Sequence, residues 1–162
     1  MIDSTVAAIY EGWEVYQGKL VKAVTPLTAD QLALRAAPGL RPVHDLLTHL
    51  IAVRVRWFHR GAGAEPERAD LDEIGTWDRP AQPARTPAEL LAGLETSWQV
   101  IKNAIGQWTP DELSTPFTVS YAGTEQTFTR NWIIWHVLEH DLHHGGEISF
   151  SLGMHGLPGL DL

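Results

Sequence analysis

The sequence contains no cysteine among its 162 residues. No disulfide, thiolate metal ligand or cysteine nucleophile can therefore form within the chain. Any bound metal must be held by imidazole, carboxylate or water, and any thiol chemistry would need a thiol supplied from outside.

Long apolar runs and excess positive charge are also missing. No stretch approaches the roughly 18–20 apolar residues that cross a bilayer, and no signal peptide follows Met1, so we expect a cytoplasmic protein without a membrane partner. The net charge of -8 and the pI near 5.4 argue against binding nucleic acid, whose phosphates attract a basic surface. The length and a hydrophobic content of 44% predict a single domain over residues 1–162.

Apolar residues recur at helical spacing in four segments of the chain. The third segment opens with Thr86-Pro-Ala-Glu89, which is typical of a capping box with proline at the first helical position. Each helix must bury its apolar stripe against its neighbours, so the pattern predicts an all-α fold, an antiparallel four-helix bundle. The expected helices span residues 6–24, 42–58, 86–108 and 130–152.

Two stretches between these helices have a different composition. Residues 59–86 are rich in glycine, proline and charge and predict a long loop, in which Trp77 is a candidate lid over a pocket. The β-prone runs Phe117–Tyr121 and Thr127–Thr129 surround a glycine and predict a small β-hairpin before the last helix.

The last helix carries four of the 8 histidines, His136, His140, His143 and His144. His140 and His144 are one turn apart on one face, so both imidazoles can converge on one divalent metal. Asp141 stands where the zinc-protease motif has glutamate, which excludes a protease of that class. His143 points about 60° away and is expected at the surface. For His136, orientation of a ligand ring and plain packing both remain open.

A third ligand is needed, because catalytic zinc usually has three protein ligands. His49 lies in the middle of the apolar face of the second helix, where an unpaired polar ring would cost about 1–3 kcal/mol. The sequence therefore predicts a metal site formed by His49, His140 and His144. His44 and His59, at the two ends of that helix, are readily explained as solvated residues.

The run His136-x-x-x-His140-x-x-His143-His144-x-Gly146 resembles the last-helix signature of the DinB-like (DinB/YfiT) metal-binding four-helix-bundle proteins. His49, after Leu-Leu-Thr, resembles the ligand in that family's second helix. The resemblance implies a divalent metal, often nickel or zinc, bound by three histidines, and frequent homodimers. Relatives include thiol-S-transferases and a maleylpyruvate isomerase that use low-molecular-weight thiols such as bacillithiol or mycothiol.

The sequence departs from that family at Gly145 and Glu147, where arginine and glutamine are usual. The missing arginine removes any ion pair that it makes in relatives. Glu147 is close enough to His144 to orient its ring or, alternatively, to act as a fourth ligand.

Two classes of function fit these features. One is a metal-dependent enzyme that activates a thiol or water for transfer, isomerisation or hydrolysis of a small molecule, with Glu147 or His136 relaying a proton. The acidic net charge disfavours an anionic thiol substrate unless arginines such as Arg54 or Arg56 offset it. The alternative is a non-catalytic, metal-stabilised module that binds a small ligand or responds to stress. A closed ligand shell favours the module and an open position favours the enzyme.

Overall fold

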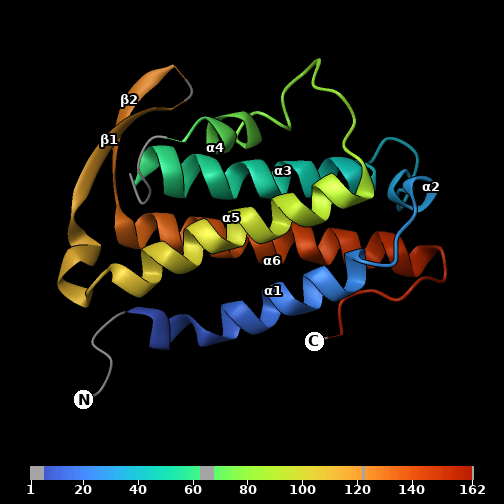
Figure 1. Ribbon diagram of the computed structural model, residues 1–162, viewed down its shortest axis with the longest axis horizontal. Coiled ribbons are helices and arrows are strands. Elements are labelled where there is room, and N and C mark those ends of the chain that lie inside the picture. The colour runs from blue at the N-terminus through green and yellow to red at the C-terminus, as the bar shows by residue number, and fades with distance from the viewer. Residues whose placement is uncertain (1–5, 63–67, 122, 162) are drawn as a thin grey trace.

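Four long helices form the body of the molecule in the computed structural model, which describes residues 6–62, 68–121 and 123–161 (Figure 1). They are α1 (Glu11–Val24), α3 (Val43–Val55), α5 (Pro87–Gln107) and α6 (Arg130–Met154). Helices α3 and α5 run in one direction, and α1 and α6 run in the opposite one. The predicted four-helix bundle is confirmed. None of the helices in the described residues is long and apolar enough to span a membrane.

Shorter elements connect the bundle helices. They are two 3₁₀ helices (Val6–Tyr10 and Pro110–Ser114), α2 (Ala29–Leu32), a π-helical turn that extends α3 (Arg56–Gly61), and α4 (Ala69–Ile74). The continuous loop expected over residues 59–86 is therefore wrong in part, because the π turn enters it and α4 interrupts it. Helix α4 buries Leu71 and Ile74 against the bundle, and six residues are too few for a helical period to be visible in the sequence.

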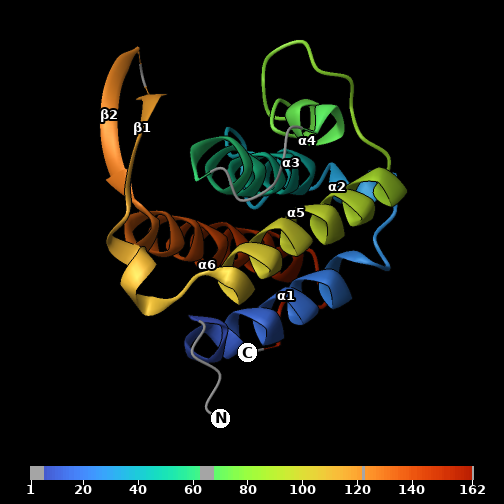
Figure 2. The same ribbon diagram turned by 60° about the vertical axis from the view of Figure 1, so that its left-hand side comes forward.

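The predicted hairpin is present as β1 (Pro116–Tyr121) and β2 (Thr124–Thr129), which pair antiparallel with Phe117 opposite Phe128. The hairpin projects from the bundle at the start of α6 (Figure 2). Phe128 stacks on Trp132, and its ring centroid lies 5.2 Å from that of Trp57. These aromatic contacts fix the hairpin beside the end of α3.

Helix α3 lies between α5 and α6 and is buried on most of its circumference. Its central aliphatic side chains Leu46, Leu47, Leu50 and Ile51 have at most 2% of their surface exposed. A helix enclosed on all sides needs apolar residues all round, which is why its stripe is broad. His49 is thus held on a rigid element.

A buried ion pair joins α3 to α6. Arg54 donates through Nε and Nη2 to the carboxylate of Asp141, at 2.8 to 3.1 Å, and neither side chain is exposed. Trp13 of α1 donates its indole N–H to the same carboxylate at 2.7 Å. The neutralised pair sets α1, α3 and α6 relative to one another, directly beside His140.

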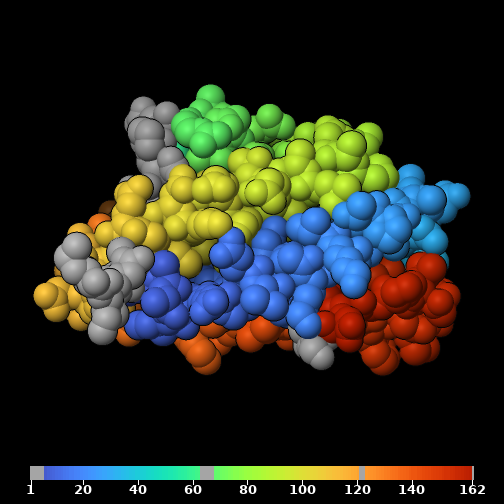
Figure 3. Space-filling model, turned by 60° about the horizontal axis from the view of Figure 1, so that its bottom comes forward, coloured from blue at the N-terminus to red at the C-terminus, as the bar shows by residue number. Residues whose placement is uncertain are grey.

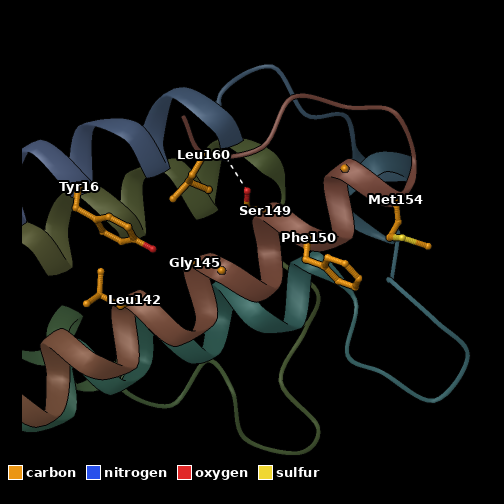
Figure 4. A pocket seen from close by; sticks show the side chains of 9 residues that line it. Tyr16, Leu142, Gly145, Ser149, Phe150, Met154 and Leu160 are labelled. Atoms are coloured by element: carbon orange, nitrogen blue, oxygen red, sulfur yellow. Dashed lines mark hydrogen bonds between the residues drawn. The ribbon is translucent and has the colours of Figure 1, made fainter. Parts of the chain in front are cut away.

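Helix α1 lies across one face of the molecule, between α5 and the C-terminal part of α6 (Figure 3). It approaches α6 closely where Tyr16 meets Gly145 (Figure 4). A Cβ atom on Gly145 would lie 1.8 Å from the Tyr16 hydroxyl oxygen. The glycine is therefore required by packing, which accounts for the absence of the arginine expected at this position.

Candidate metal centre

Three imidazoles meet between α3 and α6. The Nε2 atom of His140 lies 3.1 Å from Nε2 of His49 and 3.1 Å from Nε2 of His144. These are the three histidines that the sequence predicted, and their nitrogen atoms could hold a metal ion. Metal–nitrogen distances of about 2.0–2.1 Å in a tetrahedral site place ligand nitrogens roughly 3.3 Å apart, close to the spacing seen.

Carboxylates orient two of the three rings. Oδ2 of Asp78 lies 2.6 Å from Nδ1 of His49, and Oε2 of Glu147 lies 2.5 Å from Nδ1 of His144. A carboxylate accepts hydrogen bonds, so in both rings Nδ1 carries the proton. Their Nε2 lone pairs then face the centre of the cluster. The same carboxylate–histidine arrangement fixes the ligand tautomer in metal sites.

The cluster favours neutral imidazoles. Burial, reinforced by the neighbouring His144 and His49, lowers the pKa of His140 to about 3. Burial also lowers the pKa of His144, although the Glu147 carboxylate opposes this shift. Both rings are therefore uncharged at neutral pH, which is the form that binds metal.

The lone pairs provide a test of whether a metal fits. His49 and His144 both present an Nε2 acceptor, and His140 has only one Nε2 proton to offer them. At least one of the two close contacts thus joins two lone pairs, unless a cation accepts them. Nδ1 of His140 is also buried without a hydrogen-bond partner among the described residues. A divalent cation bound to the three Nε2 atoms would accept their lone pairs, and Nδ1 of His140 would keep its proton without a partner among the described residues.

Asp78 is held in place by its own partners. Arg56 donates from Nη1 and Nη2 to its two oxygens at 2.6 and 2.9 Å. Burial raises the pKa of Asp78, but hydrogen bonds from His49 and Arg56 outweigh this and hold the pKa well below its ordinary value. The carboxylate is ionised whenever the protein is folded at neutral pH.

Trp77 anchors the segment that carries Asp78. Its ring packs so closely on Gly93 of α5 that a Cβ there would lie 2.5 Å from the indole. Arg85 lies over the ring, 4.6 Å from its centroid. Trp77 also lines the hollow that opens from His49, and its role as a lid stays a prediction.

The remaining histidines lie outside the cluster. His136 stacks on Trp132, with ring centroids 4.6 Å apart, and its centroid is 6.2 Å from that of His140. His143 has 67% of its side chain exposed, as predicted. His44 accepts a hydrogen bond from the backbone N–H of Arg85 at 3.0 Å. His59 is buried, so the solvated position expected for it is wrong.

A second charged contact stands next to the cluster. Nη2 of Arg41, which precedes α3, lies 3.5 Å from Glu147 Oε2 and 3.3 Å from Nδ1 of His144. Because Nδ1 already donates to Glu147, the guanidinium pairs with the carboxylate. Arg41 thus places a positive charge beside this end of α6. Position 145, where the family usually has an arginine, is a glycine in this chain.

Two hollows open beside His49. One of about 380 Å³ extends from His49 and His140 towards the hairpin, and the other of about 440 Å³ extends from His49 towards Asp45 and Pro83. A small molecule can therefore reach the exposed side of the cluster, which is the arrangement of a site with an open coordination position.

Comparisons with known proteins agree on the fold. The model of the DinB superfamily matches residues 13–148. The crystal structure of a DinB-like protein from Bacillus cereus ATCC 10987 is 18% identical with a TM-score of 0.74, over 99% of both chains. A conserved protein from Enterococcus faecalis is 16% identical with a TM-score of 0.65, over 92% of this chain and 98% of that one. No curated protein matches the sequence.

Proposed function

The chain belongs to the DinB superfamily, and we propose that it is a metal-dependent enzyme that acts on a small molecule. Its ligands are His49, His140 and His144, and zinc or nickel suits an all-imidazole site. One observation carries the proposal: three imidazoles bring their Nε2 atoms together at one point that adjoins two hollows. A purely structural site would be closed on all sides.

The bound metal supplies one kind of chemistry, namely lowering the pKa of a thiol or a water molecule so that a nucleophile forms near neutral pH. The chain's own groups prepare for this. Asp78 and Glu147 hold the protons at Nδ1 of His49 and His144, so both Nε2 lone pairs stay available. The reaction is a transfer, isomerisation or hydrolysis, and a transferred thiol comes from a small external molecule because the chain has no cysteine.

The proposal is tested by activity assays on metal-loaded protein. Conjugation of a low-molecular-weight thiol to a small electrophile and hydrolysis of small esters are each measured before and after metal removal. We expect one activity that is lost with the metal and in His49→Ala, and kept in the exposed control His143→Ala. A full metal complement without either activity would overturn the enzyme and favour the non-catalytic binding module.

The homodimer implied by family membership stays a proposal. Helix α6 exposes Leu142, Phe150 and Met154, each with at least half of its surface accessible, around an apolar hollow (Figure 4). Light scattering on the purified protein measures the oligomeric state directly, and a monomer at all concentrations would contradict the dimer.

A further inference from the structure

The hollow between His49 and the hairpin has an unusual charge for this acidic protein. Among the residues that the structure describes, those that line it include three arginines and no aspartate or glutamate. The chain as a whole has a net charge of -8. Arginines thus gather in the cavity that adjoins the imidazole cluster, and a guanidinium without a carboxylate partner attracts anions there.

Two of the three arginines are paired with carboxylates. Arg56 pairs with Asp78, and Arg60 donates from Nε to Asp72 at 2.7 Å. The guanidinium of Arg79 has no ion pair or hydrogen bond within the described ranges 6–62, 68–121 and 123–161. Arg79 also lines both hollows beside His49. Among the described residues that line the cavity, Arg79 is therefore the arginine without a carboxylate partner. Arg54, which the sequence left as a candidate for this role, is fully buried against Asp141.

The backbone that carries Arg79 is rigid and strained. The N–H of Gln82 donates to the carbonyl of Arg79 at 3.3 Å and closes a tight turn with Pro80 and Ala81 at its centre. Ala81 has a φ of 68°, a left-handed conformation that favours glycine. Strain of this kind concentrates at functional sites, where the surrounding structure holds it in place. The preceding anchor at Trp77, Pro80 inside the turn and Pro83 directly after it restrict movement of this turn.

Part of the cavity wall is apolar. Val53 and Trp57 line it from the α3 side, and Val119 lines it from the hairpin. A ligand that fills this space would bury an apolar body against these side chains and present a charged group near Arg79. A guanidinium binds a carboxylate through two parallel hydrogen bonds, which suits it to this role.

We infer that the substrate of this site is a small organic anion, a carboxylate joined to an apolar body, and that Arg79 recognises its charged group. The inference deepens the proposed function and depends on it for the reaction, but recognition of the anion by Arg79 does not require the metal. Arg79 is thus a specificity-determining residue.

The test uses 4-fluorobenzoate and its uncharged counterpart 4-fluorobenzamide as probes, with binding to the full-length protein followed by fluorine NMR. We expect the acid to bind more tightly than the amide. Arg79→Gln should weaken binding of the acid at least tenfold and leave the amide within about twofold. The matched control is Arg35→Gln, which removes an exposed arginine that donates to Leu40 and does not line the cavity.

Equal binding of acid and amide, or unchanged binding of the acid in Arg79→Gln, would overturn the inference. Metal-free His140→Ala separates the inference from the proposed function. Arg79-dependent binding of the acid should persist in this variant. If His140→Ala lost binding of 4-fluorobenzoate while Arg79→Gln kept it, the probe's carboxylate would bind the metal. That result would overturn the role of Arg79. Absence of metal from the wild type, with Arg79-dependent binding intact, would contradict only the proposed function.

Discussion

Asp78 and His49 are 29 residues apart in the chain, yet their Oδ2 and Nδ1 atoms are separated by only 2.6 Å. The contact connects the loop after α4 to the centre of α3. It fixes the proton on Nδ1 and makes Nε2 the metal-facing atom of the ring. Arg56 holds the same carboxylate from the other side.

Asp78→Asn should weaken metal binding by roughly 10–100-fold, because loss of the carboxylate releases the ring and lowers its basicity. The measurement is a titration against a competing chelator of known affinity. Asp72→Asn is the matched control, since its partners Arg60 and His59 are not among the three ligands. Equal affinities in the two variants would show that Asp78 does not support the site.

Substitution of neighbouring glycines tests the close approach of α1 to α6. Gly145→Ala should destabilise the protein by about 1–3 kcal/mol, because its Cβ would collide with Tyr16. Gly146→Ala meets nothing within 4 Å and should stabilise the helix by about 0.5–1 kcal/mol. Urea unfolding of both variants measures the difference. Similar stabilities for the two variants would contradict the packing described.

The buried pair of Arg54 and Asp141 gives a third test. Asp141→Asn should cost about 3–5 kcal/mol in urea unfolding, since it leaves a buried guanidinium without its counter-charge. Glu14→Gln, which breaks the exposed contact with Lys102, should cost at most about 1 kcal/mol. The double variant Arg54→Met, Asp141→Leu should recover part of the loss. If Asp141→Asn lowered the free energy of unfolding as little as Glu14→Gln does, the buried pair of Arg54 and Asp141 would not stabilise the fold.

Acid should destabilise the metal-free protein through His140. Its pKa falls from an ordinary value of 6.5 to about 3 on folding, so between these values the unfolded chain binds a proton that the folded chain lacks. The contribution to stability is thus complete above pH 6.5 and is lost as the pH falls towards 3. The urea midpoint should decrease between about pH 7.5 and 5, and decrease less in His140→Asn. Identical pH dependence in the two proteins would contradict the shift.

The histidine cluster could be predicted from the sequence because its signals are local. His140 and His144 are one turn apart, and His49 interrupts an apolar stripe. The four long helices could also be predicted, from their apolar stripes and, for α5, from the capping box at Thr86. The structure confirms this capping box.

Asp78 and Arg79 could not be predicted, because their positions depend on tertiary packing. No periodic pattern marks their segment, and its path is set by contact of Trp77 with a glycine on α5. The same holds for Gly145, whose meaning depends on Tyr16 in a different helix. The glycine that stands in place of the family arginine is thus explained only by the packing of α1 on α6.

Metal content of the untagged protein, measured by elemental mass spectrometry, tests the central claim most directly. We predict close to one divalent metal per chain in the wild type and in His143→Ala, and loss of metal in His49→Ala and His140→Ala with helical circular dichroism retained. No metal above background after reconstitution, or full metal content in both ligand variants, would contradict a site that joins α3 to α6.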